Sequence, residues 1–191
     1  MRTAVLFMVL AISVVVAACG NQGNSPASTG PAAGPGNGRV PLGDGRISFV
    51  PPTNLKQLTK EQIAASKFSK GKPPDYVFAN DSQSATVGVV LNFIPLKPDE
   101  LEDYVYANHR LLSMAIEDVE FLAEEIVTIN GRQWVHFEVL SEVPDIALHN
   151  HQYTTSFNGG ALVVGFNSTP QEYPQFKDAF LKSAQSIEVK E

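Results

Sequence analysis

The most regular alternation of apolar and polar side chains in this chain lies between Ser84 and Ile94. Every second residue from Ala85 to Phe93 is apolar, and this period of two predicts a β-strand. Further along, Asn130-Gly131 and Asn158-Gly159 each separate two segments of strand composition. Asn-Gly is a preferred pair for a two-residue type I′ turn, so the pattern predicts two antiparallel hairpins. They join residues 121–129 to 132–140, and residues 149–157 to 160–167.

The two-residue turn also predicts the register of the first long hairpin. Ile126 should face Val135, and Val127 should face Trp134. Large apolar groups then lie on both faces of the hairpin, which predicts a sheet covered on both sides. A smaller hairpin is predicted around Gly43-Asp44-Gly45, with residues 40–42 and 47–50 as its strands. Pro41 should confine the first of these strands to the edge of a sheet.

Three segments carry the signals of helices. Thr59 and Gln62 have the spacing of a capping box, which predicts a short helix beginning there. Pro98 and the acidic residues after it predict the start of a long helix. One face of that helix should be apolar: Leu101, Tyr104, Val105, Leu112 and Ala115.

The last helix is predicted from a capping box at Thr169-Pro170-Gln171-Glu172, with Pro170 as its first helical residue. Its core-facing stripe should be Tyr173, Phe176, Phe180 and Ala184, and residues 186–189 should add a closing strand. Strands joined by tight hairpins cannot form a parallel doubly wound sheet. The order of elements therefore predicts an α+β fold, an antiparallel β-sheet flanked by helices.

The amino-terminal segment has the pattern of an export signal. Arg2 is followed by an apolar run from Ala4 to Ala18, which is shorter than the roughly 20 residues of a membrane-spanning helix. Cys19 is the only cysteine of the chain and directly follows two small residues. This arrangement resembles the bacterial lipobox, in which the signal is cut before the cysteine and the thiol receives a lipid. The alternative is an ordinary signal peptide with an incidental cysteine.

This interpretation divides the chain into three parts. Residues 1–18 are expected to be a lipoprotein signal peptide, and residues 39–191 a globular domain. Residues 19–38 comprise Cys19 and a linker with six glycines, three prolines and no charged residue, which is the composition of a flexible tether. The protein should then attach to the membrane through a lipid on Cys19. Gly20, directly after it, favours the periplasmic face of the outer membrane if the cell is Gram-negative.

Composition and charge narrow the function. The 191 residues carry a net charge of −6, which disfavours non-specific binding to nucleic acid. A single cysteine excludes a disulfide framework within one chain and a thiolate-rich zinc site. The motifs of serine hydrolases, zinc proteases and nucleotide-binding loops do not occur. No catalytic residue and no cofactor is therefore predicted, and an envelope hydrolase is without a supporting motif.

A family resemblance rests on turn and core residues. These are Ile47-Ser48-Phe49-Val50-Pro51, Thr128-Ile129-Asn130-Gly131 and Gly165-Phe166-Asn167-Ser168, the last followed by a helix with Phe176 and Phe180. Together they resemble the PsbP-like α/β/α sandwich, and within it the bacterial DcrB-type lipoproteins, over residues 39–191. The resemblance implies a platform that binds other proteins. It implies no shared set of catalytic residues, so no site residue is carried over.

The best candidate for chemistry is the pair His149 and His151. Residues two apart on a strand point the same way, so both imidazoles could meet one metal ion, zinc or copper. His136 and Glu125, opposed across the first long hairpin, could add ligands if the two hairpins are neighbours. The simpler interpretation is an exposed polar strand start, with His136 and Glu125 as a surface pair. Two imidazoles alone fall short of a stable zinc site, so no metal ligand set is predicted.

These observations favour one function over another. The leading hypothesis is a membrane-anchored, non-enzymatic envelope lipoprotein that serves as a binding or accessory platform for another protein. The aromatic side chains best suited to anchor such a partner, where exposed, are Tyr104, Tyr106, Trp134, Tyr153 and Tyr173. The alternative is a periplasmic module that binds a metal or a small ligand through His149 and His151.

Overall fold

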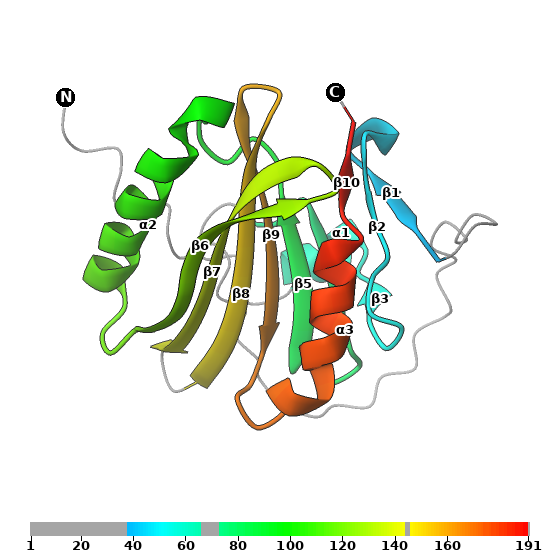
Figure 1. Ribbon diagram of the computed structural model, residues 1–191. Coiled ribbons are helices and arrows are strands. Elements are labelled where there is room, and N and C mark those ends of the chain that lie inside the picture. The colour runs from blue at the N-terminus through cyan, green and yellow to red at the C-terminus, as the bar shows by residue number, and fades with distance from the viewer. Residues whose placement is uncertain (1–37, 66–72, 144–145, 191) are drawn as a thin grey trace.

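A computed structural model describes residues 38–65, 73–143 and 146–190, and it has an α+β architecture in three layers (Figure 1). The central layer is a seven-stranded antiparallel sheet in the order β3-β4-β5-β9-β8-β7-β6. Its strands are β3 (Lys56–Gln57), β4 (Tyr76–Ala79), β5 (Ala85–Val90), β6 (Glu120–Ile129), β7 (Arg132–Val143), β8 (Ile146–Phe157) and β9 (Gly160–Ser168). The fold class predicted from the sequence is confirmed.

One face of the large sheet is covered by helix α3 (Tyr173–Gln185) and by a three-stranded sheet of β1 (Val40–Leu42), β2 (Ile47–Phe49) and β10 (Glu188–Val189). Their apolar side chains share one core with the large sheet, in which Phe49, Phe166 and Phe180 are almost fully buried. Because β1 pairs only with β2 in that small sheet, Pro41 does lie on an edge strand.

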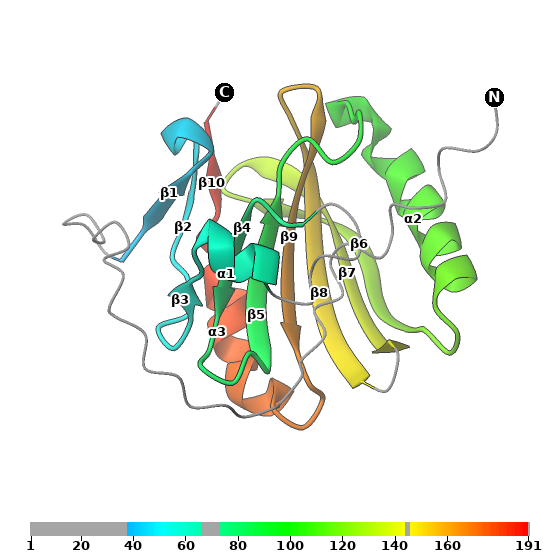
Figure 2. The ribbon, with the colours of Figure 1, turned by 180° about the vertical axis from the view of Figure 1, so that it is seen from behind.

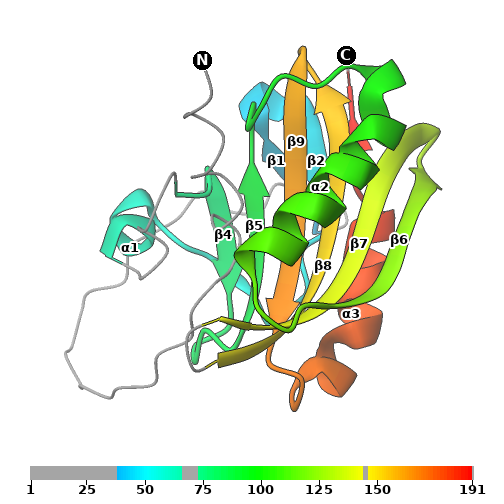
Figure 3. The ribbon, with the colours of Figure 1, turned by 90° about the vertical axis from the view of Figure 1, so that its left-hand side faces the viewer.

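The other face is covered by two helices, α1 (Lys60–Ala65) and α2 (Leu101–Ala115), which Figures 2 and 3 show from behind and from the side. A second core joins α2 to the sheet through Leu101, Leu112 and Phe137. Helix α1 contributes Ile63, which packs against Val77 of β4. With helices on both sides of the sheet, the predicted α/β/α layering is confirmed.

The turn chemistry agrees with the prediction. Asn130 and Gly131 have φ of 48° and 79°, and Asn158 and Gly159 have φ of 53° and 74°, as type I′ turns require. Ile126 pairs with Val135 and Val127 with Trp134. The first helix is capped as expected: the Gln62 side chain accepts from the Thr59 amide at 2.8 Å, and Thr59 Oγ1 accepts from the Gln62 amide at 3.2 Å.

The predicted carboxyl end of the strand at residues 84–94 and the predicted start of the last helix are wrong. Strand β5 ends at Val90, and all six of its residues are buried, because the sheet is covered on both faces and Asn92 turns the chain with φ of 51°. Helix α3 begins at Tyr173, after a turn closed by Thr169, so the proline of its first turn is Pro174 and not Pro170.

On α2, Ala115 is exposed and Asn108 takes a place in the buried stripe. The helix ends at Ala115, and Ile116, the residue after it, is buried in its place. Two short 3-10 turns, η2 (Gly43–Gly45) and η4 (Pro98–Glu100), complete the described elements. Among the described residues, no helix has the length and apolar character needed to cross a membrane. Cys19 and the predicted signal and linker up to residue 37 lie outside the described residues.

Candidate functional site

Polar side chains gather on the inner face of strands β7 and β8, under helix α3. The two strands are antiparallel, with Glu138 opposite His151 and His136 opposite Tyr153. Because side chains two apart on a strand share a face, His149 lies on the same face as His151. The pairing of the two hairpins therefore brings together three of the four histidines of the chain.

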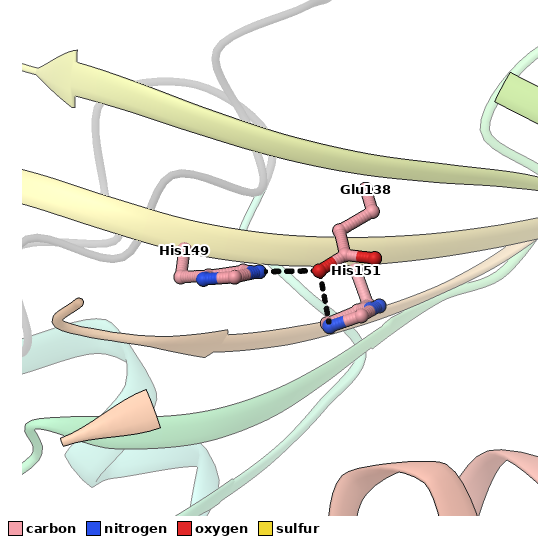
Figure 4. A group of neighbouring side chains, drawn as sticks. All are labelled: Glu138, His149 and His151. Carbon is pink, nitrogen blue, oxygen red and sulfur yellow. Dashed lines mark hydrogen bonds and ion pairs between the residues drawn. The ribbon is translucent and has the colours of Figure 1, made fainter. Parts of the chain in front are cut away.

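The centre of this cluster is the carboxylate of Glu138. Its Oε1 atom lies 2.7 Å from His149 Nε2 and 3.6 Å from His151 Nε2 (Figure 4). One ligand atom from each of the three residues lies within 4.8 Å of the others. Two imidazole nitrogens and a carboxylate oxygen thus converge on one point.

Tyr173, in the first turn of α3, covers the cluster on the side of that helix. Its hydroxyl oxygen is 2.7 Å from His151 Nε2 and 3.3 Å from Glu138 Oε1. Its ring also stacks on the imidazole of His149, with the ring centres 3.5 Å apart. The helix therefore holds the orientation of both histidines as well as covering them.

A second line of contacts leads from the cluster to the surface. His136 Nε2 is 3.1 Å from His151 Nδ1, and His136 Nδ1 is 3.3 Å from Glu125 Oε1. The ring of His136 stacks on Tyr153, with the centres 4.5 Å apart. The Glu125 side chain, on edge strand β6, is 57% exposed, so this chain of polar groups runs from the interior to solvent.

The predicted exposure of the three histidines is wrong. His149 and His151 were expected at an exposed strand start, yet they are 7% and 2% exposed. Strand β8 begins at Ile146, before both residues, and α3 packs over its inner face. The predicted pair of His136 with Glu125 is confirmed, but His136 is only 7% exposed and is not a surface residue.

Glu138 is the member of the cluster that sequence reasoning missed. His136 and Glu138 alternate on one face of β7, which the period of two already implies. The sequence analysis did not predict the register between β7 and β8, in which Val143 pairs with Ile146. In the sequence, a proline followed by an aspartate stands between these two residues, and such a pair is a common turn signal. A two-residue connection at this pair predicts that Glu138 lies opposite His151.

The charge state of the cluster follows from its surroundings. Burial lowers the pKa of His151 to about 4, outweighing the attraction of Glu138, so this imidazole is neutral at neutral pH. Burial also acts to raise the pKa of Glu138, but the hydrogen bond from His149 and the neighbouring imidazoles hold that pKa below its usual value. Burial, together with the Glu138 carboxylate, raises the pKa of Tyr173 to about 12.

Some of the hydrogen-bond directions follow from the groups themselves. Because a carboxylate only accepts, His149 Nε2–H donates to Glu138. The Tyr173 hydroxyl has one hydrogen, so it donates either to His151 Nε2 or to Glu138 Oε1. If it donates to His151, then His151 Nδ1–H donates to His136 Nε2 and His136 Nδ1–H donates to Glu125.

The five aromatic side chains predicted to anchor a partner differ in their exposure to solvent. Tyr104, Trp134 and Tyr153 are buried, with exposures of 8%, 1% and 6%, and Tyr173 is half-buried in the cluster. Tyr106 is 73% exposed on the outer face of α2. Among the five aromatics, Tyr106 is therefore the side chain best placed to contact another molecule.

The fold, unlike the sequence, is similar to known proteins. No family model and no curated protein matches this chain. Cyanobacterial PsbP (CyanoP) from Synechocystis sp. PCC 6803 superposes with a TM-score of 0.56 at 18% identity, over 84% of this chain and 98% of that one. LpqN of Mycobacterium tuberculosis, a protein involved in cell envelope biogenesis, superposes with a TM-score of 0.52 at 10% identity, over 80% and 91%. The chain thus has a PsbP-like fold, as its turn and core residues predicted.

Proposed function

We propose that this protein is a lipid-anchored, non-enzymatic accessory protein of the cell envelope, whose PsbP-like domain holds another envelope protein. In a Gram-negative cell its place would be the periplasmic face of the outer membrane. Two observations support this proposal. The fold is shared with LpqN, which is involved in cell envelope biogenesis, and the outer face of α2 carries side chains suited to an interface.

That outer face is the single observation from the structure on which the proposal depends. Tyr106 and Met114 are 73% and 68% exposed, and Arg110, also exposed, lies between them at intervals of four residues. Residues four apart on a helix lie on one side of it, so the three side chains form a stripe. Tyrosine, arginine and methionine are the residue types enriched at protein interfaces. We call Tyr106, Arg110 and Met114 the α2 stripe.

The neighbouring sheet edge is less suited to partner binding. Strand β6 is the edge strand beside α2, and an unpaired edge can add a strand from another chain. Here the strand has an irregularity between Phe121 and Ala123 and carries Glu120, Glu124 and Glu125. A bulge and charged side chains are devices that protect an edge from pairing. The partner is therefore expected on the helix.

Site-specific photocrosslinking tests the proposal in the native membrane. A photoreactive amino acid replaces Tyr106 in one variant of the full-length chain and Lys182 in another. Lys182 is exposed on α3, on the opposite side of the sheet. A single adduct with one envelope protein is expected from position 106 only. The identified partner should then bind the purified protein, with an affinity at least about tenfold weaker for Tyr106→Ala. Equal crosslinking from both positions would contradict the proposal.

The lipid anchor needs a test of its own. Cys19→Ser removes the proposed acceptor of the lipid, so the variant should stay unacylated and retain its signal. Intact-mass measurement of the wild-type protein should show a chain that begins at residue 19 and carries added acyl mass. A wild-type protein without acyl mass, beginning elsewhere, would leave the domain without the proposed anchor.

The alternative function, a periplasmic module binding a metal or small ligand through His149 and His151, has a specific observation in its favour. Glu138 supplies a third ligand atom that the sequence interpretation lacked. The two functions are compatible, because the cluster lies under α3 and the α2 stripe lies on the other face of the sheet.

A further inference from the structure

We infer that Glu138, His149 and His151 form a binding site for one divalent transition metal ion, in the first instance Zn²⁺, with the Tyr173 hydroxyl beside its fourth position. The inference does not depend on the proposed partner binding, since it concerns other residues on the other face of the sheet. Two imidazoles and one carboxylate are a recurrent protein ligand set for zinc, with the fourth position left to water or another oxygen.

The distances already approach those of a coordinated ion. Zinc–nitrogen and zinc–oxygen bonds of about 2.0–2.1 Å in a tetrahedron keep the ligand atoms about 3.3 Å apart. Glu138 Oε1 lies 2.7 Å from His149 Nε2 and 3.6 Å from His151 Nε2. These two separations differ from the tetrahedral spacing by about 0.3–0.6 Å, and the two imidazole nitrogens lie within 4.8 Å of each other. Side-chain rotations would bring the three atoms to coordinating distances.

The contacts of His151 also suit a metal ligand. Its Nε2 atom lies 3.6 Å from Glu138 Oε1, and its Nδ1 atom lies 3.1 Å from His136 Nε2. Histidines that bind metals usually donate their other ring N–H to a fixed acceptor, which orients the ring and makes it more basic. With Nε2 bound to zinc, His151 would carry its proton on Nδ1, where His136 Nε2 can accept it, and His136 is itself held by Glu125. Zinc binding at His149 Nε2 would move the proton of a neutral His149 from Nε2 to Nδ1.

Packing also holds the ligands in place before an ion arrives. The rings of His149 and His151 are stacked with centres 5.3 Å apart, and Tyr173 lies against His149 at 3.5 Å. All three imidazoles are under 10% exposed. Because little side-chain freedom remains to be lost on binding, the site is preorganised. Aliphatic side chains would fill this part of the core without the cost of burying polar groups.

Zinc binding by the full-length protein, purified in mild detergent, tests the inference. The protein is treated with a chelator, returned to Zn²⁺ and analysed for metal content and by titration calorimetry. One equivalent of tightly held zinc is expected. Glu138→Gln keeps the shape and hydrogen-bonding capacity of the side chain but removes its charge, and His149→Ala removes a ligand. Each variant should weaken zinc binding by about 100-fold or more, and His136→Phe by about 10- to 100-fold.

His109→Ala is the matched control. His109 is the fourth histidine, on α2, where its Nδ1 atom lies 2.7 Å from Glu124. This variant should keep one equivalent of zinc with unchanged affinity. A second control replaces Zn²⁺ by Mg²⁺ or Ca²⁺, which prefer all-oxygen sites and should not bind the cluster.

A measurement on the wild-type protein covers the case in which a buried variant fails to fold. Zinc should shift the imidazole NMR signals of His149 and His151 and leave those of His109 in place. Co²⁺ in the same site should give the intense visible absorption of a four-coordinate ion. Folded wild-type protein that binds no zinc, or zinc binding that shifts only His109, would overturn the inference. So would zinc affinity unchanged in folded Glu138→Gln and His149→Ala.

Discussion

Asn130 joins the turn of the first long hairpin to the carboxyl-terminal end of the fold by two hydrogen bonds. Its replacement by glycine measures how much these bonds contribute to the free energy of unfolding. The Asn130 side-chain amide donates to the carbonyl oxygens of Gln185 and Ile187, at 3.1 and 2.8 Å. The residue itself has φ of 48°. Glycine adopts this conformation without steric cost, so Asn130→Gly removes the two hydrogen bonds and leaves the turn unstrained.

The expected loss of stability follows from the exposure of the two bonds. A hydrogen bond contributes a net 0.5–1.5 kcal/mol, roughly, and bonds open to water lie at the low end. The bond to Gln185 is exposed and the bond to Ile187 is partly buried. Asn130→Gly should therefore lower the free energy of unfolding by about 1–2 kcal/mol. In a domain of this size that corresponds to a fall in Tm of about 2–8 °C.

The second hairpin offers a matched control. Asn158 has φ of 53° in the same kind of turn, but its side chain accepts from Arg46 at the exposed surface, at 3.0 Å. Asn158→Gly should change stability by no more than about 0.5 kcal/mol. Trp134, the single tryptophan, is 1% exposed, so its fluorescence reports unfolding in a denaturant titration. Equal midpoints and slopes for the two variants would refute the assigned role of Asn130.

Three further predictions concern the turn, the cluster and a close contact. Gly131→Val should lower the free energy of unfolding by about 1–3 kcal/mol through backbone strain alone, because φ is 79° and open space surrounds the added Cβ; denaturant titration measures this. Because the pKa of His151 is lowered to about 4 in the folded protein, the unfolded chain binds the proton more readily. Stability should then fall by up to about 3 kcal/mol as pH falls from 6.5 to 4, and a Tm independent of pH in that range would contradict it. Gly160→Ala should also destabilise, by about 1–3 kcal/mol, since its Cβ would lie 3.0 Å from the Asn92 Cα atom; an unchanged Tm would argue against this contact.

Some features of the candidate site were predicted correctly from the local sequence pattern, and others were not. The spacing of His149 and His151 placed both imidazoles on one strand face, and the Asn130-Gly131 turn placed Glu125 opposite His136. Both are correct, because each depends on a few neighbouring residues and on the period of two. The predicted solvent exposure of that face is wrong, because both imidazoles are buried. Its burial depends on α3, whose Tyr173 comes 22 residues after His151 in the chain.

Helix ends were predicted less well than helix faces. The stripe of Phe176, Phe180 and Ala184 is buried as its spacing indicates. Half of the capping pattern at Thr169 is also used, since Thr169 Oγ1 accepts from the Glu172 amide at 3.4 Å, yet three turn residues precede the helix. Capping motifs and turns satisfy the same backbone groups, so the local sequence is compatible with either start.

By itself, the sequence determined the turns, the period of each long element and the antiparallel class of the fold. These depend on the backbone preferences of adjacent residues, such as the positive φ of Asn130 and Gly131. Only the tertiary structure decided which hairpins are neighbours, that β10 pairs with β2, and that Glu138 meets His149 and His151. Such contacts join residues distant in the chain. They follow from how the whole set of apolar faces is buried at once, which no short segment encodes.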